Sequence, residues 1–316
     1  MKFAFEWQFS AARRRVSLAL VAAALVVACG GGTQAIQAFV PGRIIAFGDE
    51  TNLITSSGKS YSIGGLDTNS VLDCGAQPIW LQILSIGYGF VLEQCKGTLT
   101  EFKAISRATV GAQADDVSAQ LEVQIAAGGF KTDDLATVLV GANDVLDLYA
   151  RFPAQSEAAL TAELEARGKR VGQQVNRLVG LGPRVIVVTI PDVSLSPYAR
   201  AQKVANTDTD RMALLSRLVY AYNASVRLNI INDGRFVGLV LGDEQVQAMN
   251  VSPPSFSLTD VATAACTVAL PDCTTATLIT GATALNHLWA DDRRPGPNWH
   301  SRIANLAASR ARLNPF

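Results

Sequence analysis

Residues 43–50 read RIIAFGDE, a short apolar run that ends in a glycine and two carboxylates. A continuous apolar run of this length is typical of a central strand whose two faces are both covered by helices. Three later stretches show the same pattern, and we predict them to be strands as well: Leu135–Gly141, Arg184–Ile190 and Phe236–Leu241. The pattern therefore predicts a sheet buried between two layers of helices.

Segments with helical spacing and charged outer faces separate these runs. We predict helices over Asp115–Ala127, Ala158–Leu181 and Asp208–Asn229, and a last one from about Asn298 to Arg312. Strands that alternate with helices of this length indicate an α/β domain with a parallel sheet. We expect about five strands in it.

The composition excludes several classes of function. The chain has 316 residues, 49% of them hydrophobic and 17% charged, as in an ordinary globular protein. Its 27 basic and 27 acidic residues cancel, so no overall basic field exists to hold nucleic acid. Two histidines and five cysteines, without a Cys-x-x-Cys pair, do not form a zinc motif. We expect no metal, no cofactor and no nucleic-acid partner.

The N-terminus has the features of an export signal. Arg13, Arg14 and Arg15 precede the apolar run of residues 16–28, which is too short to span a bilayer core of about 30 Å. We therefore expect a cleaved secretory signal; the alternative is a buried N-terminal helix.

The end of this run, Val26-Val27-Ala28-Cys29, resembles the lipobox of bacterial lipoproteins. The resemblance implies a signal peptide over residues 1–28 and a lipid anchor on Cys29, with residues 29–40 as lipidated cysteine and tether. No aspartate follows Cys29, which favours the outer membrane, facing the periplasm or the surface. Cleavage removes four basic residues and one acidic residue and leaves a net charge of −3.

Four cysteines remain after Cys29. In the oxidising compartment that an exported protein enters, we predict the local pairs Cys74–Cys95 and Cys266–Cys273, although four cysteines allow three connectivities. The first pair lies in a segment without the strand–helix alternation, which we interpret as an insertion over about residues 51–103.

Four polar blocks follow the predicted strands or precede helices, the positions where open α/β sheets bind ligands. They are Phe47-Gly48-Asp49-Glu50, Ala108 to Ala112, Gly141-Ala142-Asn143-Asp144, and Trp289 to Pro295. Together and in this order they resemble the blocks of the SGNH (GDSL-type) hydrolase family. The resemblance implies an ester hydrolase fold over residues 41–316, a three-layer α/β/α sandwich with a mainly parallel, flavodoxin-like sheet.

Two residues depart from the family pattern. Glu50 stands where the family has its nucleophilic serine, and Arg294 stands where it has the histidine that activates the serine. The positions that the resemblance assigns to the oxyanion hole, the backbone N–H of Gly111 and the side-chain amide of Asn143, are retained. So is Asp291 of the last block.

Neither replacement can perform the family's chemistry. Acyl transfer needs a hydroxyl nucleophile and a neutral imidazole that accepts its proton, whereas a guanidinium with a pKa above 12 is not a base. We therefore hypothesise that Glu50 and Arg294 form a salt bridge in place of the catalytic pair. Two classes of function stay open: a degenerate, envelope-anchored esterase with a binding or structural role, and an active carboxyl-ester hydrolase with a non-standard site.

The second class needs another reactive group. Thr51 could supply a hydroxyl, Glu50 could activate water if it were unpaired with a raised pKa, and His300 could act as a displaced base. If Gly111 and Asn143 were retained only by descent from an active esterase, nothing would keep the side-chain amide of Asn143 directed to the same point as the N–H of Gly111. The ligand expected in either case is a small ester, acyl or glycan group; the sequence gives no oligomeric state.

Overall fold

The computed structural model describes residues 38–313 of the chain. The predicted signal, Cys29 and most of the tether lie outside these residues. Within them, no helix is both long enough and apolar enough to cross a membrane.

The main sheet within the described residues has five strands in the order β4-β1-β5-β6-β7, with every neighbouring pair parallel. Counted along the chain this is the order 2-1-3-4-5 of flavodoxin-like folds, as expected. The strands are β1 (Arg43–Gly48), β4 (Ala104–Ser106), β5 (Asp134–Leu139), β6 (Arg184–Val188) and β7 (Val237–Val240). All but β4 were predicted. That edge strand has three residues, too few to show a hydrophobic pattern.

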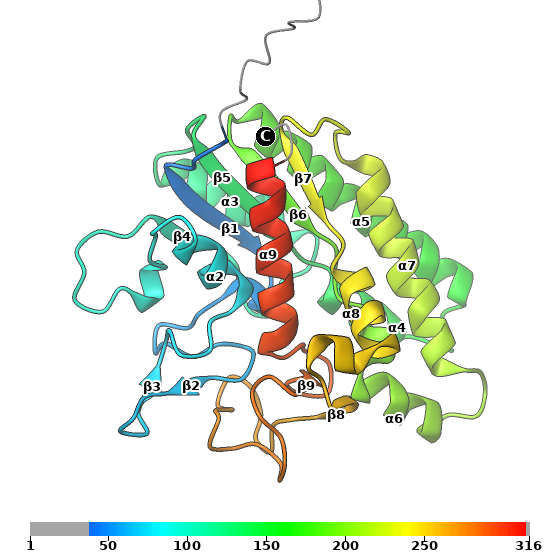
Figure 1. Cartoon of the computed structure of the whole chain (residues 1–316). Helices are drawn as coiled ribbons and strands as arrows, with labels where there is room; N and C mark the ends of the chain where they lie inside the picture. Colours follow the sequence, from blue (N-terminus) through cyan, green and yellow to red (C-terminus); the bar gives the residue numbers. More distant parts are fainter. Residues whose placement is uncertain (1–37, 314–316) are drawn as a thin grey trace, which may run out of the picture. The chain divides into compact units, whose positions relative to one another are not determined.

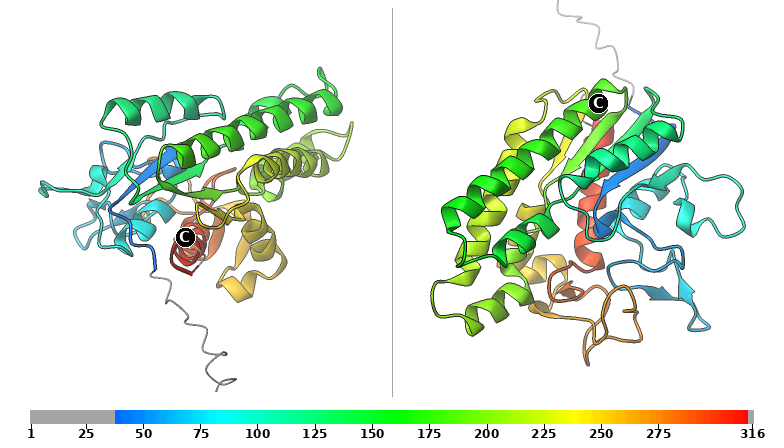
Figure 2. Two further views of the ribbon diagram at one scale, coloured as in Figure 1. Left: turned by 90° about the horizontal axis from the view of Figure 1, so that it is seen from above. Right: turned by 180° about the vertical axis from the view of Figure 1, so that it is seen from behind.

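Helices cover both faces of this sheet, so the fold is an α/β/α sandwich (Figure 2). One face carries α3 (Asp116–Ala126), α5 (Glu157–Gly180) and α7 (Arg211–Asn229). The other carries α2 (Trp80–Ile86), α8 (Gly242–Val251) and α9 (Pro297–Leu313). The predicted helices are confirmed to within a few residues at each end. Helix α2 was not predicted, because it lies in the segment interpreted as an insertion without strand–helix alternation.

The remaining elements are short and lie around the ends of the sheet strands. They are α4 (Ala142–Tyr149), α6 (Pro197–Ala205), the single turns η1 (Glu50–Asn52), η2 (Glu93–Cys95), η3 (Val193–Leu195) and η4 (Pro253–Phe256), and the strand pairs β2 (Gly65–Leu66) with β3 (Leu72–Asp73) and β8 (Asp260–Ala264) with β9 (His287–Trp289).

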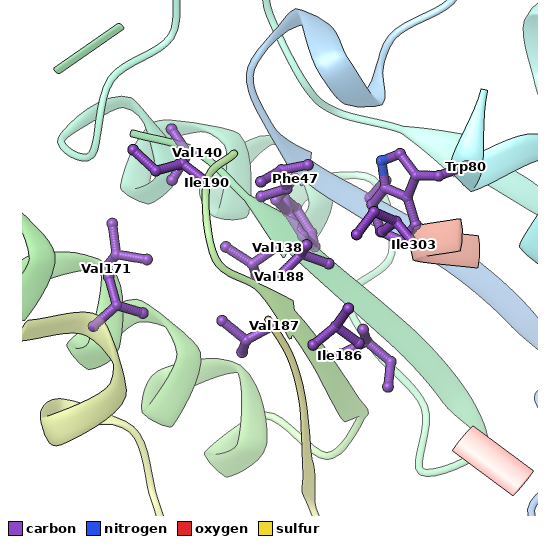
Figure 3. Close-up of a cluster of buried hydrophobic side chains, with 14 of the residues drawn as sticks. Phe47, Trp80, Val138, Val140, Val171, Ile186, Val187, Val188, Ile190 and Ile303 are labelled. Carbon is purple, nitrogen blue, oxygen red and sulfur yellow. The ribbon is translucent and has the colours of Figure 1, made fainter. Parts of the chain in front are cut away.

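The core is formed by both faces of the sheet and the helices against them (Figure 3). Val187 and Val188 are successive buried residues of β6, so their side chains point to opposite faces. Val171 of α5 lies in the core on one side, and Trp80 and Ile303 lie next to each other on the side of α2 and α9. Each such side chain contributes about 1.5–3 kcal/mol through burial.

Both predicted disulfides are present. Cys74 and Cys95, and Cys266 and Cys273, have Cα–Cα distances of 5.8 Å. Neither bridge touches a strand of the main sheet: the first closes the segment between η1 and β4, and the second closes a loop after β8. They cross-link the two irregular segments of the described chain.

Candidate active site

The four polar blocks come together at the carboxyl edge of the sheet, the edge at which the parallel strands end. Glu50 begins the turn directly after β1, and Asn143 lies in the first turn of α4, directly after β5. Gly111 lies in the loop between β4 and α3. Asp291 and Arg294 follow β9. Residues up to 244 positions apart in the chain are therefore in contact.

Glu50 and Arg294 form the hypothesised salt bridge. Oε1 of Glu50 accepts hydrogen bonds from Nη2 of Arg294 at 2.6 Å and from its Nε at 3.0 Å. The side chain of Glu50 is 5% exposed and that of Arg294 is 26% exposed. Two charged hydrogen bonds to one oxygen in a largely buried setting make this a strong contact.

The second oxygen of Glu50 contacts the two retained amide donors. The backbone N–H of Gly111 donates to Oε2 at 2.9 Å, and Nδ2 of Asn143 donates to the same atom at 3.1 Å. Asn143 is therefore not turned away from Gly111: both donors point at one place. Gly111 has φ +75°, a conformation that glycine adopts without strain and that belongs to the turn presenting its N–H.

Asp291 holds Arg294 from the other side. Its Oδ2 accepts from Nη1 of Arg294 at 2.7 Å, and its Oδ1 accepts from the backbone N–H groups of Arg293 and Arg294 at 2.9 and 2.6 Å. Arg294 thus lies between two carboxylates, in the order Asp291, Arg294, Glu50.

Glu50 and Arg294 are both charged at neutral pH. Burial raises the pKa of Glu50, but the positive charge of Arg294 and the N–H of Gly111 outweigh it, so the pKa is lowered below its usual value. Burial likewise lowers the pKa of Arg294, and the two carboxylates more than compensate and raise it. Both groups are therefore ionised.

Comparison with known proteins adds the following. No family model matches the chain. A phosphatidylcholine-sterol acyltransferase from Aeromonas hydrophila is 26% identical over 235 residues, which is 69% of this chain and 63% of that protein. A lipolytic protein of the G-D-S-L family from Veillonella parvula has a TM-score of 0.42 at 10% identity, covering 84% of this chain and 95% of that one. A catalytic variant of an acetylxylan esterase from Geobacillus stearothermophilus has a TM-score of 0.44 at 13% identity, covering 87% and 96%.

The four motif blocks meet at one site in the order of the SGNH pattern. The chain is similar to the SGNH (GDSL-type) hydrolases. Glu50 and Arg294, the two residues that differ from those expected from the sequence resemblance, face each other in the salt bridge.

Two further carboxylates of the four blocks bind backbone donors. Oδ1 of Asp49 accepts from the N–H of Thr51, and Oδ2 of Asp144 accepts from the N–H of Ala114. Burial and the charge of Glu50 raise the pKa of Asp49 to about 7. Burial raises the pKa of Asp144 to about 6, although Ala114 and Arg167 oppose it.

The cleft over the salt bridge is small. Thr51 and Asn143 line it together with Glu50 and Arg294, and the space that water-sized molecules can enter is about 20 Å³. On this measure a single water needs about 10–15 Å³. Thr51 thus borders the cleft, but the lining contains no histidine that could take its proton.

His300 has a structural position. It is 1% exposed, its Nδ1 accepts from the backbone N–H of Trp80 at 3.3 Å, and burial lowers its pKa to about 3. The nitrogen that would have to take a proton is already hydrogen-bonded. The displaced-base alternative therefore has no support in this geometry. His287, in β9, is also buried, and its Nδ1 bonds the side chain of Asn286.

Residues that hold the site in place were not predicted from the sequence. Asn52 donates to the carbonyl of Leu139 at 2.7 Å and accepts from the indole of Trp80 at 3.0 Å. Gln120 accepts from the N–H of Gly48 at 2.7 Å and donates to its carbonyl at 2.9 Å. These partners lie 28 to 87 positions apart, so no local pattern indicates them. Glu50 begins only the single turn η1, which provides little helix dipole for its carboxylate.

No group of His, Cys, Asp and Glu side chains within residues 38–313 is arranged to hold a metal ion.

Proposed function

We propose that this chain is an SGNH-like protein in which ester hydrolysis has been lost and replaced by a binding or structural role in the cell envelope. One observation carries the proposal: a carboxylate oxygen of Glu50 occupies the position between Gly111 and Asn143 where an SGNH hydrolase would bind the oxyanion of its substrate. The site is filled by the protein itself.

Displacing this oxygen is unfavourable for an ester. The carbonyl oxygen of an ester is neutral, whereas the carboxylate of Glu50 accepts four hydrogen bonds, two of them from a guanidinium. Charged hydrogen bonds are about twice as strong as neutral ones. A substrate would also have to enter a cleft of about 20 Å³, far below the 300–1,000 Å³ of ordinary ligand sites.

The route through activated water is disfavoured for a related reason. A general base must have a free lone pair and a pKa near the working pH. Both oxygens of Glu50 are engaged and its pKa is lowered, not raised. Glu50 therefore acts as an ion-pair partner.

The alternative function is that of an active carboxyl-ester hydrolase. The specific observation in its favour is that Gly111 and Asn143 still point at one atom and that Asp291 still orients its partner. For this function the salt bridge would have to open when the substrate binds.

Hydrolysis of p-nitrophenyl acetate and p-nitrophenyl octanoate separates the two functions. We expect no hydrolysis above background by the wild-type chain or by Glu50→Ser or Arg294→His alone. The double variant Glu50→Ser with Arg294→His has hydroxyl and imidazole together, and we expect it to exceed either single variant by about 100-fold or more. Wild-type activity that disappears in Glu50→Ala would instead make Glu50 catalytic.

We further propose that Cys29 carries the lipid anchor and that the protein resides in the outer membrane. The lipobox-like sequence supports this proposal. Metabolic labelling with palmitate should label the chain and not Cys29→Ser, and the labelled chain should co-sediment with outer-membrane fractions. A chain that is unlabelled but exported would contradict the anchor and leave the proposal for the active site untouched.

A further inference from the structure

The edge at which the parallel strands begin, the amino edge, lies opposite the candidate active site. The described chain enters at Ala38, just before β1, so its first residues lie at this edge (Figure 1). Helices α2, α5, α7 and α9 run antiparallel to the strands and end there. Whatever precedes Ala38 therefore joins the domain at the amino edge and not at the site.

Large apolar side chains are exposed at this edge. They come from the chain entry, from the ends of α2, α5 and α7, and from the loop before β7, and their exposed fractions run from 37% to 84%. These residues are Val40, Ile86, Leu181, Leu228, Ile231 and Phe236. Single exposed apolar residues are ordinary, but a group from separate segments on one edge is a feature of interaction surfaces.

The same edge carries an excess of positive charge. This edge carries the basic side chains Lys103, Lys131, Arg310 and Arg312 and the acidic side chains Glu101 and Asp133. Asp134 and Asp233 are paired with Arg43 and Arg235. Basic residues thus exceed acidic ones here, although the predicted mature chain has a net charge of −3. The net charge of the amino edge is therefore opposite in sign to that of the predicted mature chain.

A pocket of about 570 Å³ lies beside the edge strand β7. Leu228, Ile231 and Leu239 form apolar walls, and Arg310 flanks them. Arg227 and Asp233 also line the pocket, and each is in an ion pair, with Asp243 and Arg235 respectively. Arg310 donates to the carbonyl of Leu239, a neutral group, so this contact does not neutralise its charge. A cavity of this size with apolar walls and the cationic side chain of Arg310 beside them is complementary to an anionic amphiphile.

We infer that the amino edge docks on an anionic phospholipid surface, namely the membrane to which Cys29 is proposed to be anchored. The inference rests on that proposed location and extends it. Nine residues lead from Cys29 to Ala38 and reach about 30 Å at most, so a lipid on Cys29 keeps this edge close to the bilayer. Apolar side chains then enter the interface while basic ones face lipid phosphates.

Docking in this orientation turns the carboxyl edge, with Glu50 and Arg294, away from the membrane. Any ligand of the site therefore reaches it from the aqueous side. A lipid within the bilayer is not accessible to it.

The test uses the full chain reconstituted into vesicles of phosphatidylcholine alone or with one part in three of phosphatidylglycerol, analysed by flotation and amide hydrogen exchange. We expect exchange at residues 181–184 and 228–236 to slow only in the anionic vesicles, with residues 142–149 at the other edge unchanged. Lys131→Glu with Arg310→Glu should lower this protection by about fivefold for each charge removed.

Two further variants keep the outcome interpretable. Val40→Ser with Leu228→Ser removes only exposed apolar groups, so it retains the core and should also lose protection. Lys59→Glu with Lys203→Glu changes the same number of charges on exposed side chains away from the amino edge. This variant should leave the protection of the amino edge from exchange unchanged.

The outcomes separate docking from anchoring. A chain that floats with both vesicle types but shows the same exchange in both has the anchor, and the docking surface is then refuted. A chain that floats only with anionic vesicles has the docking surface without the anchor. A chain that floats with neither type of vesicle has neither the anchor nor the docking surface. Loss of protection in the control variant equal to that in the amino-edge variants would also refute the inference.

Discussion

The side chain of Glu50 is long enough to reach the two amide donors that the proposed function assigns to the oxyanion hole. One oxygen meets Gly111 and Asn143 while the other meets Arg294. Arg294 alone would lie beside Asp291 with a surplus of donors, and Glu50 alone would be a buried carboxylate without a cation. Each residue thus supplies the charge that the other needs.

Removing one partner should therefore lower the free energy of unfolding by more than the intact pair contributes to it. We expect Arg294→Ala to lower the free energy of unfolding by about 3 kcal/mol or more, because Glu50 is left buried and unpaired. The double variant Glu50→Ala with Arg294→Ala should cost clearly less than the sum of the single variants. Urea denaturation of all four proteins gives the coupling energy.

The exposed pair Arg217 and Glu157 provides the matched control for this cycle. Its coupling energy should stay below about 1 kcal/mol, as for other exposed pairs. Additive effects at Glu50 and Arg294 would show that their contact does not stabilise the fold.

Shortening Glu50 should create an anion site. In Glu50→Ala, the N–H of Gly111, the amide of Asn143 and the guanidinium of Arg294 lose their shared acceptor and surround the space it leaves. We expect acetate at millimolar concentrations to raise the Tm of Glu50→Ala and not that of the wild type. Thermal denaturation with acetate or chloride at equal ionic strength measures this. The same shift in Glu50→Ala with Asn143→Ala would assign it to non-specific salt effects.

Asp49 should make stability depend on pH. Its pKa is about 7 in the folded state and about 3.9 in an unfolded chain, so between these values the folded state holds a proton that the unfolded state has lost. Its contribution to stability therefore falls as pH rises from about 4 to 7 and is constant above. Asp49→Asn should be more stable than the wild type by on the order of 3–4 kcal/mol at pH 8 and nearly equal at pH 4.

Denaturation of both proteins across this range tests the prediction. A difference in stability that is the same at every pH would mean that Asp49 is ionised throughout.

At the scale of elements, the site depends on how closely β1 and β5 approach where they end. Gly48 ends β1 with φ +127°, and a Cβ there would lie 1.9 Å from the carbonyl oxygen of Leu139, the last residue of β5. The side chains of Asn52 and Gln120 bind the same strand ends. A turn this tight places Glu50 next to Asn143.

Gly48→Ala should therefore destabilise the protein by several kcal/mol, because backbone atoms must move. Gly89→Ala is the control: its φ is also positive, at +74°, but nothing lies within 4 Å of the added Cβ. Backbone strain alone should cost it about 1 kcal/mol. Equal Tm losses in the two variants would show that the close approach to Leu139 is unimportant.

At the scale of the whole molecule, the two disulfides hold segments that the main sheet does not. Cys74 and Cys95 close a loop of 21 residues, and Cys266 and Cys273 close one of seven. Loop entropy predicts a loss of about 3 kcal/mol when the first pair is changed to serine and about 2 kcal/mol for the second. Differential scanning calorimetry of both variants, with and without reductant, measures this. Reductant should lower the Tm of the wild type and leave a variant lacking both pairs unchanged.

Much of the fold was predictable because its signals are local. The apolar run of β1 and the helical spacing of α5 each occupy one continuous stretch, so the alternation of strands and helices can be identified along the chain. Strand β4 and helix α2 were missed because they are short and lie in an irregular segment, and they form by packing against β1 and α9.

The sequence by itself determined the α/β class and the residue types at positions 50 and 294, and it favoured the local disulfides, because each depends on residue type and short spacing. Only the tertiary structure decided where the carboxylate of Glu50 lies. Its contacts with Gly111, Asn143 and Arg294 span 61, 93 and 244 positions. Distances across such separations are set by strand register and by the turns at the carboxyl edge. No local pattern contains them.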